Sequence, residues 1–160
     1  MDLLRVAALT GALIVFGAAP AFADLTGFIG VNTTPENRMT RGFSAGLGVL
    51  LIGFEFEYAN TAEDVDERLP SLKTYSGNLL LQTPFSIFRM QPYFTTGAGL
   101  YRERLGAATD TGIAFNTGGG VKVDLVGPLR VRVDYRVFRL GSDALYSPAH
   151  RLYAGINLKF

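Results

Sequence analysis

The sequence has 160 residues and is close to neutral, with 15 lysines and arginines against 14 aspartates and glutamates. This balance excludes the basic surface typical of nucleic-acid-binding domains, so we expect no nucleic-acid partner. Cysteine is absent, which excludes disulfides and thiolate metal sites, and a single histidine is too few for a histidine-based metal centre. We therefore expect no metal and no cofactor.

The first element in chain order is a short apolar run near the N-terminus. It is followed by Ala21 and Ala23, in the small-x-small arrangement of a secretory cleavage site. The run is shorter than the roughly 20 residues that a membrane helix needs to span a bilayer. We therefore predict a signal peptide over residues 1–23, cleavage between Ala23 and Asp24, and a single domain over residues 24–160. Because no cysteine follows the cleavage site, a lipid-anchored lipoprotein is excluded.

Apolar and polar residues then alternate with a period of two, which predicts β-strands whose two faces meet different surroundings. The sixth strand is the weakest of the eight, because three consecutive glycines at 118–120 interrupt it. The eight predicted strands cover approximately residues 25–33, 42–50, 52–59, 73–83, 92–102, 112–123, 129–138 and 149–160.

The connections between the predicted strands alternate in length. Those after the first, third, fifth and seventh strands are polar loops, at residues 34–40, 60–70, 103–110 and 141–149, whereas those after the second and sixth are short. This alternation is typical of outer-membrane barrels, which have long extracellular loops and short periplasmic turns. The connection at 84–90 is an exception because it is longer and apolar, and residues 50–52 contain no turn residue that locates their bend.

The two faces of these strands differ in chemistry. One face is apolar and has aromatic residues near its ends, namely Tyr58, Tyr75, Phe94, Phe115, Tyr135 and Phe160. The opposite face carries charges mixed with glycine, namely Glu55, Glu57, Lys122, Arg130, Arg132, Asp134, Arg136, Arg151 and Lys159. In water the apolar face would form the core, whereas in lipid it points outward and places its aromatic rings at the headgroup level.

We predict the second arrangement, an all-β, eight-stranded, antiparallel up-and-down transmembrane β-barrel. The barrel must be closed, because open sheet edges cannot satisfy their hydrogen bonds in lipid. Eight strands enclose an interior just wide enough for side chains to fill. We therefore expect a structural ionic network that plugs the interior, formed by Glu55, Glu57, Lys122, Arg130, Arg132, Asp134 and Arg136.

The last predicted strand stops on an aromatic residue. Tyr153, Gly155, Leu158 and Phe160 fit a polar-x-Gly-x-x-hydrophobic-x-aromatic pattern, and residues 91–101 fit a Pro-Tyr-x-x-x-Gly-x-Gly pattern. In these segments and in its predicted leader, the sequence resembles the small outer-membrane β-barrel family that includes the OmpA transmembrane domain and the OmpX-like proteins.

This resemblance implies a location in the bacterial outer membrane, surrounded by outer-membrane lipid. It also implies that the barrel-assembly machinery and periplasmic chaperones are partners, and that the C-terminal pattern is an assembly signal, with Leu158 where an aromatic residue is more usual. Because function on a shared fold resides in its sites, the resemblance leaves the activity open. We expect a non-enzymatic protein with a structural role in envelope integrity or a role in surface interactions, through a surface ligand that the sequence does not identify.

Other functions remain open from the sequence. Some barrels of this size are lipid A-modifying enzymes that use a serine and a histidine, and Ser147 and His150 are the candidates here. Glu55 and Glu57 share a face, as an acid–base pair would, although ion pairing with the nearby arginines is the interpretation we favour. The acidic segment formed by Glu63, Asp64, Asp66 and Glu67 is a candidate for binding a divalent cation or a basic partner surface, but it lacks the spacing of a calcium loop, and a solvated run of charges is the interpretation we favour. A narrow porin-like channel and a soluble, lipocalin-type ligand-binding barrel are further alternatives.

Overall fold

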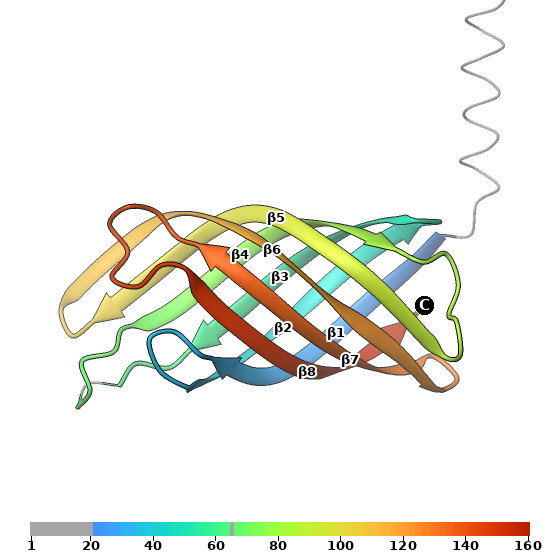
Figure 1. The fold of residues 1–160 in the computed structure, drawn as a ribbon, viewed down its shortest axis with the longest axis horizontal. Helices are drawn as coiled ribbons and strands as arrows, with labels where there is room; N and C mark the ends of the chain where they lie inside the picture. Colours follow the sequence, from blue (N-terminus) through green and yellow to red (C-terminus); the bar gives the residue numbers. More distant parts are fainter. Residues whose placement is uncertain (1–20, 65) are drawn as a thin grey trace, which may run out of the picture.

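The computed structural model of the protein describes residues 21–64 and 66–160, which form one closed barrel of eight antiparallel strands (Figure 1). Each strand pairs with its neighbours in sequence, and β1 closes the barrel against β8. The predicted all-β, up-and-down architecture is confirmed. In the described part of the chain, no helix is long and apolar enough to cross a membrane. The strands are β1 (Ala21–Asn32), β2 (Arg38–Val49), β3 (Ile52–Thr61), β4 (Ser71–Gln82), β5 (Met90–Leu105), β6 (Ala108–Val126), β7 (Leu129–Arg139) and β8 (Ala149–Lys159).

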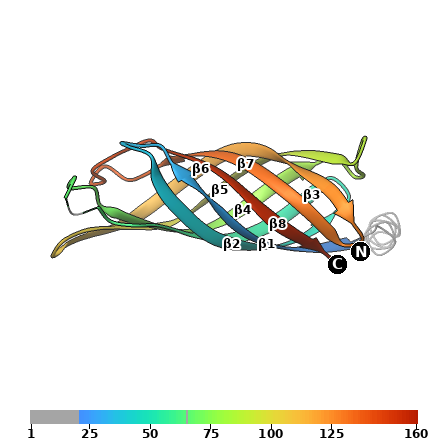
Figure 2. The ribbon, with the colours of Figure 1, turned by 90° about the horizontal axis from the view of Figure 1, so that it is seen from below.

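The barrel has two unlike ends (Figures 1 and 2). One end holds the start of β1, the C-terminus and the β2–β3, β4–β5 and β6–β7 connections, and the other holds the four remaining connections. The bend that the sequence left unlocated between β2 and β3 is a two-residue turn at Leu50 and Leu51, in which Leu50 has a φ of 53°. In the β4–β5 connection, Phe88 and Arg89 also have positive φ, and they turn the chain between Ile87 and Met90.

The prediction of a loop at residues 103–110 is wrong. β5 continues to Leu105 and β6 begins at Ala108, so only Gly106 and Ala107 form the turn. Gly106 has a φ of 59°, a left-handed conformation that glycine adopts without steric cost. The polar residues of this segment form paired strands that project beyond the body of the barrel. They can do so because backbone pairing between β5 and β6 needs no apolar face.

The predicted interruption at glycines 118–120 is also wrong. β6 runs through them without a break, and Gly119 pairs with Phe94 of β5 and Tyr135 of β7. The physical reason lies inside the barrel, where a Cβ on Gly120 would come within 2.5 Å of the Tyr93 hydroxyl oxygen. The glycine therefore makes room for an inward-facing tyrosine.

The faces of the strands are oriented with the apolar side outward. On β3, Phe54 and Phe56 are 67% and 48% exposed, whereas Glu55 and Glu57, which alternate with them, are buried. A soluble lipocalin-type barrel has the reverse orientation, which contradicts that alternative. Every strand contributes large apolar side chains to the outer surface, including Ile29, Phe43, Leu47, Phe54, Leu79, Phe94, Ile113, Phe115, Val133, Leu152 and Ile156. We call this surface the apolar band.

Candidate functional site: the ionic interior

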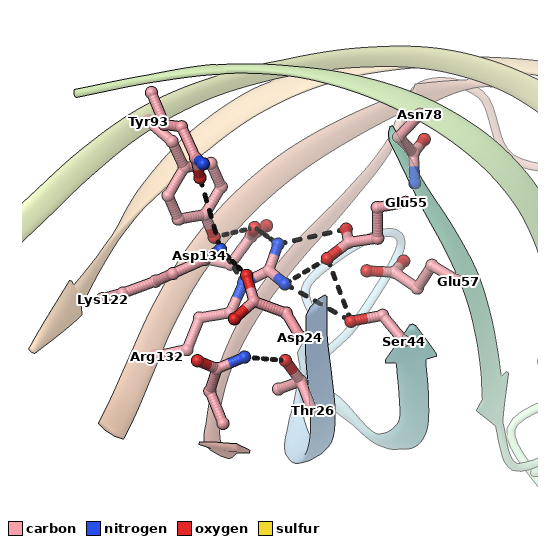
Figure 3. Close-up of polar contacts among 12 residues, drawn as sticks. Asp24, Thr26, Ser44, Glu55, Glu57, Asn78, Tyr93, Lys122, Arg132 and Asp134 are labelled. Atoms are coloured by element: carbon pink, nitrogen blue, oxygen red, sulfur yellow. Dashed lines mark hydrogen bonds and ion pairs between the residues drawn. The ribbon is translucent and has the colours of Figure 1, made fainter. Parts of the chain in front are cut away.

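The central layer of the interior joins β3 to β7 across the barrel, around the fully buried Arg132 (Figure 3). Its guanidinium binds the Glu55 carboxylate through both terminal nitrogens, with 3.1 Å between Nη2 and Oε1. Arg136 binds the same Glu55 Oε1 at 2.8 Å through its own Nη2. Both arginines also contact Asp134, at 3.1 and 2.9 Å. The Tyr93 hydroxyl accepts a hydrogen bond from Arg132 Nε at 2.7 Å and donates one to Asp134.

A second layer centres on Glu57. It lies closer to the end of the barrel that holds the β1–β2, β3–β4, β5–β6 and β7–β8 connections, which we call the loop end. Its carboxylate contacts Arg136 Nη1 at 3.2 Å and pairs with Arg151 of β8. The Tyr153 hydroxyl donates a hydrogen bond to Glu57 Oε2 at 3.2 Å, and Arg151 Nη1 donates one to Thr74 Oγ1 at 3.1 Å. Arg136 therefore links this layer to the central one.

Beyond the second layer, toward the loops, the interior holds a cluster of apolar side chains beside the buried carboxyl group of Glu103. The Arg151 guanidinium lies 4.3 Å from the centre of the Phe138 ring, which belongs to this part. Its buried side chains pack together and cover the ionic layers on the loop side: Leu72, Tyr101, Ala114, Phe138, Leu140 and Ala149.

The third ionic layer lies at the end of the barrel that holds the start of β1 and the C-terminus. Lys122 pairs with Asp24, and its Nζ is 3.4 Å from Gln82 Oε1. Arg130 Nε lies 2.6 Å from Asp124 Oδ1, and Arg130 Nη1 lies 4.0 Å from Asp24 Oδ1. A void beside Lys122 has a volume of about 10 Å³, close to the smallest that holds one water molecule.

The three layers are balanced in charge. Their cations are Lys122, Arg130, Arg132, Arg136 and Arg151, and their carboxylates are Asp24, Glu55, Glu57, Asp134 and the partly exposed Asp124. Removing one partner of a buried ion pair leaves an uncompensated charge, whose burial is strongly unfavourable. The ion pairs therefore link five strands, β1, β3, β6, β7 and β8, and they stabilise the barrel only while every charged partner is present.

The structure brings all seven residues predicted for the interior network into these layers. Lys159 has the same parity on β8 as the buried Asn157 but joins none of the layers: it is exposed at the rim, where its Nζ lies 5.8 Å from the centre of the Phe22 ring, because it ends the last strand. Sequence reasoning missed Asp24, which it treated only as a cleavage-site residue. Asp24 alternates with the apolar Leu25 and shares its face with Thr26, and this pattern is the signal that would have placed it inside.

The serine and histidine weighed as a catalytic pair are bonded to other groups. Ser147 Oγ accepts a hydrogen bond from the Leu140 backbone nitrogen at 3.1 Å. His150 Nδ1 lies 2.7 Å from the Tyr135 hydroxyl. The structure therefore holds each of the two residues against a different neighbour.

The acidic segment at 63–67 forms part of the β3–β4 loop. Asp64 Oδ1 accepts hydrogen bonds from the backbone nitrogens of Asp66 and Glu67, at 3.1 and 3.2 Å. A hydrogen bond to Glu36, followed by the charge of Glu36, raises the pKa of Glu67. Among residues 21–64 and 66–160, no group of three or more histidine, aspartate or glutamate side chains is arranged to hold a metal ion.

The residues of the predicted assembly signal fall on both faces of β8. Tyr153 is buried and Phe160 is 72% exposed at the end of the barrel. The Phe160 backbone exchanges two hydrogen bonds with Ala23, at 2.8 and 3.1 Å. The role of Tyr153, Gly155, Leu158 and Phe160 in assembly stays a prediction.

The predicted signal peptide falls mostly on residues 1–20, outside the described residues. β1 begins at Ala21, three residues before the predicted mature start at Asp24. Cleavage between Ala23 and Asp24 would remove the Ala23–Phe160 pair and leave the remaining β1–β8 ladder, which begins at Asp24 and Lys159. The cleavage site also stays a prediction.

Comparison with known proteins adds to this picture. Neither protein-family models nor curated proteins match the sequence. Solved structures do match in fold. The N-terminal β-barrel domain of OprF from Pseudomonas aeruginosa is 12% identical, with a TM-score of 0.66 over 87% of this chain and 97% of that one. Neisserial surface protein A is 17% identical, with a TM-score of 0.65 over 88% and 96%.

A third similar structure is Ail, the attachment invasion locus protein of Yersinia pestis. It is 13% identical, with a TM-score of 0.54 over 89% of this chain and 99% of that one. All three likenesses span almost the whole of the solved barrels, at identities that speak for the fold alone. The chain therefore has the fold of the small eight-stranded outer-membrane barrels, as its resemblance to the OmpA and OmpX-like family implies.

Proposed function

We propose that the chain is an integral protein of the bacterial outer membrane without enzymatic activity, with a structural role in the envelope or a role in surface interactions through its loops. The observation that carries this proposal is the apolar band around a charged interior. Contiguous apolar surface of this extent is rare on soluble monomers. In lipid the same surface is buried, and the closed ladder satisfies the backbone hydrogen bonds.

The orientation in the membrane follows from the unlike ends of the barrel. Outer-membrane barrels place their short turns in the periplasm and their longer loops outside the cell. We therefore place the start of β1, the C-terminus and the two-residue turn at Leu50 and Leu51 on the periplasmic side. The loops at 33–37, 62–70 and 140–148 and the projecting β5–β6 hairpin then face the cell exterior and are the parts available to a surface ligand.

The plugged interior favours this function over a narrow channel. Three ionic layers and an apolar cluster follow one another along the axis, and the void beside Lys122 is no larger than about one water molecule needs. The hydrogen bonds of Ser147 and His150 favour it over a lipid A-modifying enzyme. Mass analysis of lipid A from cells producing wild type or His150→Ala separates these two functions, and we expect identical profiles. A modification present only with the wild type would establish the enzyme.

The proposed location is tested by fractionation and gel migration. Folded small barrels keep their structure in detergent until boiled, because a closed ladder leaves no strand edge free. We expect the protein in the outer-membrane fraction, with a gel mobility that changes on boiling. A protein found in the periplasmic fraction, or one whose mobility is unchanged by boiling, would contradict the proposal.

A further inference from the structure

Cations occupy outward-facing positions where the strands approach the loop end. On β4, Lys73 lies on the same face as Tyr75. On β5, Arg102 and Arg104 lie on the same face as Leu100. Arg102 and Arg104 are exposed and Lys73 is partly buried. None of the three belongs to the ionic interior, so their charges serve no purpose described so far.

Strand pairing gathers these cations into one site. Lys73 lies directly opposite Arg102, and Arg104 lies directly opposite Ser71. Directly opposed residues have Cβ atoms about 4.5–5.5 Å apart, a distance at which like charges destabilise a sheet. No carboxylate is paired with Lys73 or Arg102 by an ion pair among the described residues. Arg102 Nε donates a hydrogen bond to Thr111 Oγ1 at 3.4 Å, which leaves the repulsion between the two charges in place. An anion bound between them would remove this repulsion.

A pocket of about 450 Å³ opens beside these cations. The Glu63 carboxylate pairs with Arg104, with 3.5 Å between Arg104 Nη2 and Glu63 Oε2. Glu63 Oε1 also accepts a hydrogen bond from the Gly106 backbone nitrogen at 2.6 Å. Three cations against one carboxylate leave a formal charge of +2 on the pocket. Its lining residues are Asn60, Ala62, Glu63, Ser71, Lys73, Arg102, Arg104 and Thr109.

The pocket begins where the apolar band ends. Tyr75 lies two residues below Lys73 on β4, and the Tyr75 ring lies 5.0 Å from that of Tyr58, which lies 5.7 Å from that of Phe43. Aromatic rings of this kind lie at the membrane–water interface. In the orientation proposed above, the pocket therefore faces the headgroups of the outer leaflet rather than bulk water.

From this placement, which rests on the proposed function, we infer that the pocket formed by Lys73, Arg102 and Arg104 binds the phosphate group of an outer-leaflet lipid headgroup. A phosphomonoester carries a charge of about −1.5 to −2 near pH 7, which matches the charge of the pocket. Arginine presents several donors in a fixed fork that suits phosphate oxygens. The hydroxyl and amide groups of Ser71, Thr109 and Asn60 complete a polar lining.

The test uses the folded barrel in dodecyl maltoside micelles, with bound lipid measured by native mass spectrometry. The probes are dioleoylphosphatidic acid, which has a phosphomonoester, and dioleoylphosphatidylcholine, which does not. Lys73→Gln/Arg102→Gln removes two cations from the pocket. Arg68→Gln/Lys159→Gln removes two exposed cations elsewhere and is the matched control. Heat-modifiable migration of every variant verifies that the barrel is folded.

We expect wild type to bind phosphatidic acid more tightly than phosphatidylcholine. The pocket variant should lose about thirtyfold in affinity for phosphatidic acid, because each cation near an anionic lipid surface contributes roughly fivefold. The control variant should bind as wild type does. Equal affinities for both lipids, or an unchanged affinity in the pocket variant, would overturn the inference.

Inorganic phosphate at millimolar concentration is the competing probe. We expect it to leave bound phosphatidic acid in place, and displacement would overturn the assignment to a lipid headgroup in favour of a free anion. A heat-modifiable barrel without lipid preference refutes only this inference. A wild-type protein absent from the outer-membrane fraction refutes the proposed function and the inference with it.

Discussion

Arg132 is the residue on which the interior contacts converge. It is fully buried, contacts Glu55 and Asp134 through its terminal nitrogens and Tyr93 through Nε, and lies with its guanidinium carbon 4.7 Å from the centre of the Tyr93 ring. Burial of a guanidinium is tolerated only because its partners are fixed around it, with Glu55 on β3, Tyr93 on β5 and Asp134 on its own strand, β7. The interior therefore depends on side chains as much as the wall depends on backbone pairing.

Replacement of Arg132 tests this dependence. Arg132→Leu should lower the free energy of unfolding by about 3–5 kcal/mol, because Glu55 and Asp134 each lose a buried partner. Urea unfolding of the barrel in lipid vesicles measures the change. Arg139→Leu is the matched control, since Arg139 lies on the same strand but is exposed, and it should change stability by no more than about 0.5 kcal/mol. Equal effects of the two substitutions would contradict a structural role for the interior network.

Tyr93 offers a finer test within the same layer. Tyr93→Phe keeps the ring over Gly120 but removes the hydroxyl that joins Arg132 to Asp134. We expect a loss of about 1–3 kcal/mol, the cost of leaving buried polar partners unsatisfied. The same unfolding assay measures it, with Tyr75→Phe as the control because Tyr75 is exposed in the apolar band. An unaltered stability would mean that the hydroxyl adds nothing to the network.

At the scale of elements, β8 combines two functions in one strand. Its inward residues Arg151 and Tyr153 complete the layer around Glu57, and its outward residues Leu152 and Ile156 belong to the apolar band. Phe160 lies beyond the end of the strand and contributes two backbone hydrogen bonds to Ala23, which the predicted cleavage would remove. Its side chain is exposed and joins none of the interior layers.

Deletion of Phe160 should therefore impair assembly more than it weakens the finished barrel. We expect less heat-modifiable protein in the outer-membrane fraction of cells, whereas the variant refolded in vitro should unfold at nearly the wild-type urea concentration. Phe160→Tyr, which keeps an aromatic end, is the control and should assemble normally. A deletion variant that reaches the membrane at wild-type levels would show that Phe160 is not part of an assembly signal.

At the scale of the whole molecule, the barrel is a closed wall around a filled interior (Figures 1 and 3). The apolar cluster near the loops and the three ionic layers fill the interior, and the void beside Lys122 has a volume of about 10 Å³. The side chains that pair across the barrel and stabilise it also fill it, so we expect the barrel to be impermeable to ions.

Planar-bilayer recordings test impermeability directly. The wild-type protein should give no single-channel steps, because an ion would have to displace paired charges that are fixed on opposite strands. A large porin reconstituted by the same procedure provides the positive control. Discrete, reproducible openings of the purified protein would indicate a wider or oligomeric barrel and a channel function.

The sequence alone was sufficient for the fold and for the faces of its strands. Period-two alternation assigned residues such as Glu55 and Phe54 to opposite faces, because successive side chains of a strand must point in opposite directions. The strand ends were less predictable: composition suggested a loop at 103–110, whereas backbone pairing extends the hairpin to its turn at Gly106. Likewise, the sequence predicted an interruption at glycines 118–120, whereas the strand is continuous there, and the missing Cβ of Gly120 leaves room for the Tyr93 hydroxyl.

What the sequence by itself determined was therefore local: the eight strands, their apolar and charged faces and a closed barrel as the only arrangement consistent with both. The tertiary structure decided which charges meet, because Arg132 and Glu55 are 77 residues apart and approach only across the closed barrel. It also brought Asp24 to Lys122 and set Lys73 beside Arg102 at the edge of the apolar band. Strand alternation fixes the side on which a residue lies, whereas register and closure fix the residues it contacts.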